Sequence, residues 1–541
     1  MESETISTPA NETHHPSLPQ RLSHLLAGKR THWALFASIL VLGVFARVWQ
    51  FRTLPPGLNT DEASIGLEAY DLYHYGLDRN GVSFPVHFIS FGSGQNALYG
   101  YLLIPFVALL GLSPAVVRLP MMITGILSLP LMFVVGRLIR DTRFGLLSMF
   151  FLAISPWHIL LSRLGLDSNL LPFVLLSAFT CLLLALRRPR YFIAGSILCA
   201  LAPYAYGAAY AMMPIFMALV LVIFLRARIV RFRYLATGLV AFAVVAAPIA
   251  AFILVNALGV NSLRLGPVTV PRLPVETRYE SQTALIRAAP LAGLLENSFT
   301  MLKVLVVQSD GILYNAMSPY GYFYTLTFPL AVVGIVLLIR EKNDSTKWPR
   351  YLLLAWISSA LPVGLLQASN INRLNSLFIP LILCIALCVD RLSGTGYRLQ
   401  PAWIAVFLAA FMGFSLAYHG SAYAASAKAK FHQGLLSALQ FSEQGATATI
   451  CVTDEINMPY IFALFSEKPD PKVFLSTVEY VDPSQPLRQV RSYGRYIFGT
   501  QNCSMAARPI YILMVEEIPP RLGNRYDFKF FDNYVVYFPK P

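Results

Sequence analysis

The chain has 541 residues, of which 56% are hydrophobic and only 13% are charged, and its formal net charge is +14. A soluble globular chain has about a quarter charged residues, so this composition excludes an ordinary soluble protein and predicts a multi-pass membrane protein. The positive charge does not indicate nucleic-acid binding, because most Lys and Arg residues fall in short clusters between apolar runs, which is the pattern of cytoplasmic loops.

The first 32 residues are predicted to form a disordered cytoplasmic tail. Residues 1–26 are polar, and they lack the short apolar segment and small-residue cleavage site of a signal peptide. Lys29 and Arg30 directly precede the first apolar run, so they are expected to keep this tail in the cytoplasm.

Residues 33–420 contain eleven apolar runs that are predicted to span the membrane, although several are shorter than the roughly 20 residues of a usual span. These runs are Trp33–Val48, Val116–Gly136, Phe144–Leu161, Ser168–Leu186, Tyr191–Gly207, Ala208–Leu225, Tyr234–Ala257, Phe323–Ile339, Tyr351–Leu366, Leu374–Val389 and Trp403–Tyr418. A further run, Ala97–Leu112, is predicted to lie in the interface or re-enter, because a span there would move the four basic clusters to the outer face. Those clusters lie within residues 137–143, 187–190, 226–233 and 340–350.

This topology predicts a cytoplasmic N-terminus, large outer loops at residues 52–115 and 258–322, and an extracytoplasmic domain at residues 421–541. Long loops are usually functional. The last domain is predicted to be α/β, with strands near Ala446–Thr453, Pro509–Val515 and Tyr534–Phe538 and a short helix at Pro459–Phe465. Its two cysteines, Cys451 and Cys503, either form a disulfide in an oxidising compartment or lie as separate buried thiols.

The strongest candidate site residues are Asp61 and Glu62, two adjacent carboxylates just beyond the first span. They are interpreted either as a helix N-cap, with Thr60 or Asp61 as the capping residue, or as part of a catalytic site at the outer face. Arg163 and Asp167 lie between two later spans, where charged residues are costly unless paired or functional. They form either an interfacial ion pair or the side of a cavity opposite Asp61.

Two arginines at predicted outer ends of spans, Arg118 and Arg373, are interpreted either as snorkelling side chains or as ligands of a lipid phosphate. Polar and aromatic residues are also frequent at this face, and His87, Asn96 and Tyr206 are taken as supporting site residues. No His/Cys cluster with zinc-like spacing and no Gly-rich phosphate loop is present in the sequence.

These motifs, in this order, resemble the protein O-mannosyltransferases and the related bacterial lipid A aminoarabinose transferases. Asp61-Glu62 resembles the Asp-Glu pair after the first span of those enzymes. Ser162-Arg163 with Asp167 is similar to their second motif and, more loosely, to the outer acidic motif of oligosaccharyltransferases. Further similarities are Val117-Arg118-Leu119-Pro120, Asn372-Arg373-Leu374 before Pro380, and the run from Pro85 to Gly94.

The resemblance implies a GT-C fold, all-α with about eleven transmembrane helices, and an inverting transfer from a polyprenyl-phosphate-linked sugar to an acceptor hydroxyl. It implies that Asp61 is the general base and that Glu62 orients the acceptor or the adjacent helix. Arg373, with Arg118 or Arg163, would bind the donor phosphate. Asp167 would hold Arg163 or, with Asp61, bind a divalent cation. Only Asp167 stands where oligosaccharyltransferases have paired acids, so no metal is expected.

One departure from the family is that no His-Pro-Pro or Lys-Pro-Pro precedes Ala97, so the resemblance does not predict the donor or acceptor contacts there.

The sequence is compatible with three interpretations of function. The first is a plasma-membrane glycosyltransferase that acts on a protein, lipid A or an envelope glycan. The second is a transporter or lipid flippase, which should contain inverted repeats and charges at mid-membrane. The third is a polysaccharide polymerase or ligase, which shares the donor class but differs in its acceptor.

Overall fold

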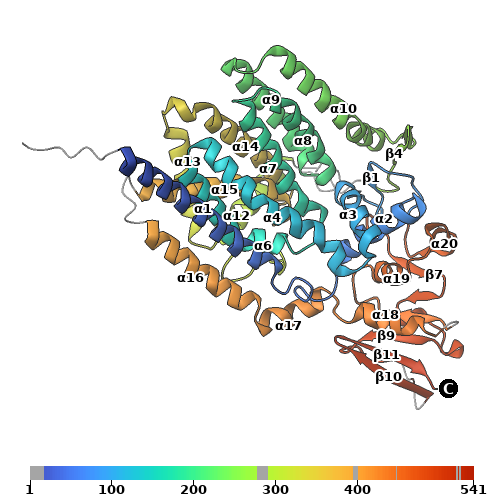
Figure 1. Ribbon diagram of the computed structural model, residues 1–541. Coiled ribbons are helices and arrows are strands. Elements are labelled where there is room, and N and C mark those ends of the chain that lie inside the picture. The colour runs from blue at the N-terminus through green and yellow to red at the C-terminus, as the bar shows by residue number, and fades with distance from the viewer. Residues whose placement is uncertain are drawn as a thin grey trace, which may run out of the picture.

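The computed structural model describes residues 18–276, 290–393, 400–445, 448–519, 522 and 525–540. It is a helical bundle that carries a mixed α/β domain at one end (Figure 1), which confirms the predicted fold class. The bundle and the segments above it contain α1 Leu18–Val48, α2 Thr60–Tyr75, α3 Leu98–Leu110, α4 Pro114–Ile139, α5 Thr142–Ile154, α6 Pro156–Leu161, α7 Asp167–Ala185, α8 Tyr191–Ala205, α9 Ala209–Ala227, α10 Phe232–Ala257, α12 Pro290–Val307, α13 Thr327–Arg340, α14 Lys347–Leu366, α15 Ile371–Leu392, α16 Gln400–Tyr418 and α17 Ser421–Lys430.

Nine helices within the described residues are long and apolar enough to cross a membrane, whereas eleven spans were predicted. Eight of the nine coincide with predicted spans, and the ninth is α12, which lies within the predicted outer loop at residues 258–322. Three predicted spans form shorter helices, α5, α8 and α13. Helix α3, in the run that was kept out of the span count, has only 13 residues and is about 20 Å long.

The predicted span at residues 144–161 is divided in two, and the break has a local cause. Pro156 has no backbone N–H and restricts the residue before it to extended backbone. Ser155 accordingly has φ −61° and ψ 120°, and its side chain caps α6 by accepting from the backbone N–H of His158. The first helix also differs from expectation, because α1 begins at Leu18 within the predicted tail; residues 1–17 lie outside the described part of the chain.

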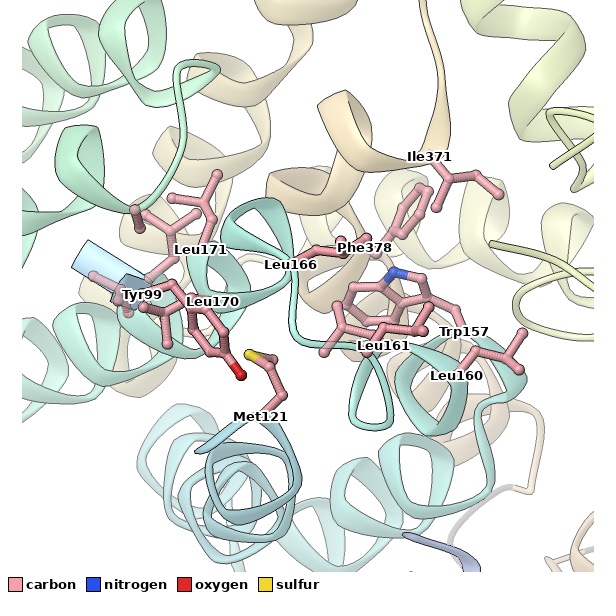
Figure 2. Packing of buried hydrophobic residues seen from close by; sticks show 14 of the residues in the cluster. Tyr99, Met121, Trp157, Leu160, Leu161, Leu166, Leu170, Leu171, Ile371 and Phe378 are labelled. Atoms are coloured by element: carbon pink, nitrogen blue, oxygen red, sulfur yellow. The ribbon is translucent and has the colours of Figure 1, made fainter. Parts of the chain in front are cut away.

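The bundle packs around α15. In its apolar stretch 89% of the residues are buried, which is the largest share among the membrane-length helices. The indole of Trp157 in α6 lies edge-on to Phe378 of α15 with ring centroids 5.1 Å apart (Figure 2). Its N–H donates to the Asn375 side chain at 2.8 Å. Helices α1, α10 and α16 are at most 22% buried and carry exposed apolar side chains such as Val41, Val244 and Leu416. We take these faces to be the lipid-facing perimeter.

The C-terminal domain contains a seven-stranded sheet in the order β10-β11-β9-β5-β8-β7-β6, in which β5 runs parallel to β8 and β9 and the other pairs are antiparallel. Its elements are α18 Leu435–Glu443, β5 Ile450–Val452, α19 Pro459–Glu467, α20 Pro471–Thr477, β6 Glu479–Tyr480, β7 Val490–Tyr493, β8 Tyr496–Phe498, β9 Ile510–Met514, β10 Tyr526–Phe531 and β11 Tyr534–Pro539. The predicted strands correspond to β5, β9 and β11, and Cys451 pairs with Cys503 in a disulfide.

This domain packs directly against segments that were predicted to form outer loops. Helix α19 packs against α2, which follows the first span (Figure 1). Short two-stranded sheets, β1 His87–Phe88 with β2 Gln95–Asn96 and β3 Leu263–Leu265 with β4 Val268–Val270, lie in the two predicted outer loops. The bundle, the predicted outer loops and the C-terminal domain therefore meet in one region.

Candidate active site

A cavity of about 840 Å³ lies where the helical bundle meets the C-terminal domain. Its volume falls within the roughly 300–1,000 Å³ of small-molecule sites. Six of the site residues predicted from sequence line it: Asp61, His87, Asn96, Asp167, Tyr206 and Arg373. Three do not, namely Glu62, Arg118 and Arg163, because they are fully buried in the protein around it.

Asp61 lies at the first turn of α2, with its side chain on the cavity wall. The N-cap is Asn59, which neither sequence interpretation named; its side chain accepts from the backbone N–H of Asp61 at 2.9 Å. Glu62 completes a capping box by accepting from the backbone N–H of Asn59 at 3.1 Å. Because Asn59 and Glu62 cap the helix, the carboxylate of Asp61 is not required for capping.

Glu62 and Arg118 form a buried, bidentate ion pair with both N–O distances at 2.8 Å. Arg118 also donates through Nη1 to the Pro55 carbonyl and through Nη2 to the Gly57 carbonyl, and Glu62 also accepts from the backbone N–H of Gly165. This arrangement corrects the expectation that Arg118 is directed toward a donor phosphate, because its donors are directed to acceptors inside the protein. The pair instead fixes the start of α2, and with it Asp61.

Arg163 likewise contacts backbone rather than the cavity. It donates to the carbonyls of Trp49 at 2.8 Å and Leu54 at 3.0 Å, and it makes longer bonds to Ala46 and Arg47 at the end of α1. A cation at a helix C-terminus is favourable because it satisfies carbonyls that lack intrahelical partners. Arg163 therefore joins α1 to the loop before α7. Of the two residues predicted to face Asp61 across a cavity, Asp167 lines the cavity with Asp61 and Arg163 does not.

Asp167, the first residue of α7, joins two other parts of the cavity wall. Its carboxylate accepts from the backbone N–H of Asn96 at 3.2 Å, and the Asn96 side chain donates to the Pro203 carbonyl and to the Tyr210 hydroxyl. The ring of His87 stacks on Phe252 of α10 with centroids 4.3 Å apart. These hydrogen bonds and the ring stacking hold the polar side chains of this part of the cavity wall in place.

Arg373 lies in the first turn of α15 and lines the cavity. The helix is capped by Asn370, whose side chain accepts from the backbone N–H of Arg373 at 2.9 Å. One guanidinium nitrogen of Arg373 donates to the Ala368 carbonyl. Of the three arginines predicted to bind phosphate, Arg373 is the one that lines this cavity.

Several cavity residues were not among the predicted site residues, and Tyr314 is one of them. Burial, and then the nearby charge of Asp61, raise the pKa of Tyr314 to about 12. Asn457, Met458, Pro486 and Leu487 come from the C-terminal domain, so that domain completes the cavity wall. The only sequence signal for Tyr314 was the length of the loop at residues 258–322. The described part of the chain contains no cluster of three or more His, Cys, Asp or Glu able to hold a metal ion.

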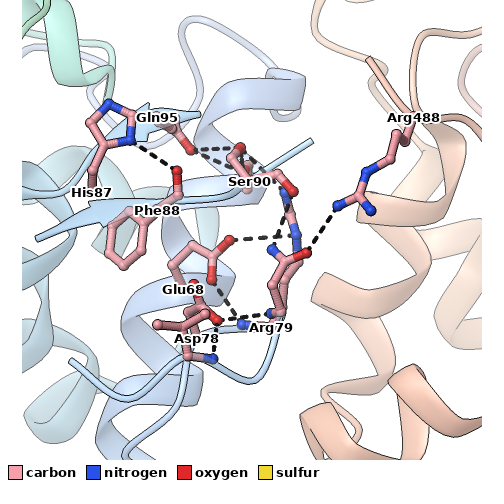
Figure 3. A network of polar contacts seen from close by, with 11 residues as sticks. Glu68, Asp78, Arg79, His87, Phe88, Ser90, Gln95 and Arg488 are labelled. Atoms are coloured by element: carbon pink, nitrogen blue, oxygen red, sulfur yellow. Dashed lines mark hydrogen bonds and ion pairs between the residues drawn. The ribbon is translucent and has the colours of Figure 1, made fainter. Parts of the chain in front are cut away.

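The carboxyl groups of Glu68, Asp71 and Asp78 are buried, as is Arg79. Figure 3 shows Glu68, Asp78 and Arg79 beside the β1–β2 hairpin. Glu68 forms an ion pair with Arg79 at 3.4 Å and accepts from its backbone N–H, while Asp78 accepts from the backbone N–H groups of Asn80 and Val82. Burial raises the pKa of Asp71 to about 9, and the charge of Glu68 adds to this effect. Asp71 is therefore protonated in the folded protein at neutral pH.

An Asp71→Asn substitution is expected to stabilise the protein increasingly as pH rises. The pKa of Asp71 is higher in the folded protein than in the unfolded chain, where it has its usual value of 3.8. The free energy of unfolding of the wild type is therefore unaffected by this group below pH 3.8 and falls as pH rises from 3.8 towards 9, because unfolding lets Asp71 ionise. The advantage of the variant should grow by up to about 1.4 kcal/mol per pH unit in that window. Thermal unfolding in detergent at pH 5 and pH 8 measures the difference in stability between the variant and the wild type. The control is Glu516→Gln, which changes an exposed carboxyl group. An equal difference at both pH values would contradict the prediction.

No protein-family model and no curated protein matches the sequence. Among solved structures, the chain is similar to ArnT from Cupriavidus metallidurans in the apo state, with 13% identity, a TM-score of 0.56 and coverage of 94% of this chain and 98% of that one. ArnT bound to undecaprenyl phosphate gives 12% identity, a TM-score of 0.55 and coverage of 93% and 97%.

The archaeal oligosaccharyltransferase AglB from Archaeoglobus fulgidus, in complex with an inhibitory peptide and a dolichol-phosphate, gives 14% identity and a TM-score of 0.51. The match covers 81% of this chain and 64% of that one, so it spans less than two thirds of the archaeal protein's length. The chain thus has the fold of GT-C membrane glycosyltransferases, with the mixed C-terminal domain arranged as in ArnT.

Proposed function

We propose that this protein is an integral-membrane glycosyltransferase of the plasma membrane. It transfers a sugar, with inversion, from a polyprenyl-phosphate-linked donor to an acceptor hydroxyl at the outer face, with its N-terminus cytoplasmic and its C-terminal domain outside. One observation carries the proposal, namely a cavity that joins the carboxylate of Asp61 and the guanidinium of Arg373 where bundle and domain meet. The similar ArnT structure binds undecaprenyl phosphate, which supports the donor class.

In this proposal Asp61 is the general base. A carboxylate within hydrogen-bond reach of the acceptor hydroxyl accepts its proton as the oxygen attacks the anomeric carbon, and such catalysis contributes about 10²–10⁴-fold. Inversion follows because the attack occurs on the face opposite the leaving phosphate. The position of Asp61 on the cavity wall, with helix capping carried out by its neighbours, supports this role.

Arg373 binds the leaving phosphate. The planar guanidinium presents paired donors to phosphate oxygens, and neutralising the charge that develops on the leaving group lowers the barrier. Glu62, Arg118 and Arg163 are positioning residues, because their contacts hold the α2 start and the end of α1. Asp167, His87, Asn96 and Tyr206 shape the sugar and acceptor side. The proposed reaction needs no metal ion; Asp61 and Asp167 would be the ligands of a divalent cation in the alternative.

The proposal is tested by comparing the polyprenyl-phosphate lipids of cells that carry the wild type or Asp61→Asn. A defective base leaves donor unused, so one lipid-linked sugar should accumulate in the variant, and its mass identifies the donor. Mass spectrometry of extracted lipids measures this. Matching lipid profiles, together with loss of a transport phenotype, would instead support the transporter or flippase interpretation. A processive polymer as product would identify a polymerase.

A further inference from the structure

A second cavity, of about 570 Å³, lies beyond the segment of the C-terminal domain that closes the first one. Leu487 lines the first cavity and Arg488 lines the second. This segment pairs with the turn after β1, because Leu487 forms a bridge with Gly92 and the backbone N–H of Arg488 donates to the Phe91 carbonyl at 2.9 Å. Successive side chains of an extended segment point to opposite sides, so this one segment forms a wall of both cavities.

The second cavity is bordered by two arginines, Arg272 and Arg488, and among the residues that line it none is acidic. Arg488 lies over the Tyr480 ring at 4.7 Å, its Nε is buried without a hydrogen bond, and its Nη2 reaches Asn80 only at 3.4 Å. No described acidic residue forms an ion pair with either arginine. Arg488 is half-buried and Arg272 is exposed, and both lie along the same cavity. The local positive charge that they produce favours an anionic ligand there.

We infer that this second cavity binds the phosphate or carboxylate group of an acidic sugar through Arg272 and Arg488. The remaining lining fits a sugar ring, since it combines the amide of Asn80 with the apolar side chains of Ile89, Leu273, Pro274, Leu475 and Val478. That this sugar belongs to the acceptor rests on the proposed function, whereas the binding itself does not.

A chain of hydrogen bonds connects the two cavities through the hairpin in Figure 3. Arg488 donates to the Asn80 side chain, Asn80 donates to the Ser90 carbonyl at 3.2 Å, and the Ser90 hydroxyl donates to the side chain of Gln95. Gln95 lines the first cavity. A ligand that orders Arg488 therefore acts on the same hairpin that supplies the first cavity with Gln95.

The test is binding of glucose 6-phosphate to the full-length protein in detergent, measured by equilibrium dialysis at fixed ionic strength. Glucose and inorganic phosphate are the comparison probes. Charge-assisted hydrogen bonds contribute about 1.5–3 kcal/mol, so Arg488→Gln and Arg272→Gln should each weaken binding about 10–100-fold. Arg488→Lys should retain part of it. The control variants Arg491→Gln and Arg264→Gln, at exposed positions on β7 and β3, should bind like the wild type.

Three results would overturn the inference. Unchanged binding in folded Arg488→Gln and Arg272→Gln proteins would show that these two arginines do not bind the ligand. Loss of binding in Arg373→Gln but not in Arg488→Gln would move the ligand to the first cavity. Equal affinity for inorganic phosphate would show a site for a free anion and not for a sugar. Because Asp61→Asn should bind glucose 6-phosphate normally, failure of the proposed transfer reaction would leave this result intact and distinguishable.

Discussion

Asp61→Asn protein is expected to lose about 10²–10⁴-fold in the rate of sugar transfer at saturating donor. Asparagine has almost the same shape as aspartate, but its amide cannot accept the acceptor's proton. The fold should be unaffected, because the α2 cap uses the backbone N–H of Asp61 and the side chains of Asn59 and Glu62. Transfer is measured with the donor identified from the lipid analysis, and folding by thermal unfolding in detergent.

The matched control is Glu516→Gln, which also neutralises one carboxylate but at an exposed position in the C-terminal domain. It should transfer sugar at the wild-type rate. A wild-type rate in Asp61→Asn would show that Asp61 is not the base. Loss of activity together with a lower unfolding midpoint would instead assign Asp61 a structural role.

Replacing Arg118 with methionine is expected to destabilise the protein by about 3–5 kcal/mol. The substitution leaves Glu62 fully buried without its partner, together with the carbonyls of Pro55 and Gly57. Removing one member of a buried ion pair costs far more than removing both, because a lone buried charge is poorly solvated. Thermal unfolding in detergent measures the loss, with Arg491→Gln as the exposed control.

The double variant Glu62→Gln/Arg118→Met separates pairing from packing. If the two charges stabilise each other as the geometry indicates, the double variant should be less destabilised than the sum of the two single variants. Strict additivity would mean that the pair contributes little beyond its packing. If Arg118 were a phosphate ligand instead, Arg118→Met would weaken donor binding and leave the unfolding midpoint close to that of the wild type.

Much of the architecture could be predicted from the sequence because hydropathy is a local property. Eight of the long helices, the three neighbouring strands β11, β9 and β5 of the C-terminal sheet and the change of composition near residue 420 follow from runs of apolar residues alone. The break at Ser155-Pro156 could in principle be predicted from the proline, but it was missed because the residues on both sides of it are apolar.

Part of the cavity wall was predicted from charged residues near helix starts, namely Asp61, Asp167 and Arg373. His87, Asn96 and Tyr206 were predicted from the frequency of polar and aromatic residues at the same face, and they also line the cavity. Tyr314 and Asn457 were missed because they lie in loops some 250 and 400 residues from Asp61, and no local pattern connects such positions.

The sequence by itself determined that this chain is a multi-pass membrane protein with a separate C-terminal domain and with charged residues gathered near the ends of its helices. Only the tertiary structure decided what those charges contact. Arg118, Arg163 and Arg373 appear equivalent in sequence, yet Arg118 pairs with Glu62, Arg163 binds the end of α1, and Arg373 lines the cavity. The physical reason is that a guanidinium binds the acceptors that folding brings within about 3 Å, and these come from distant parts of the chain.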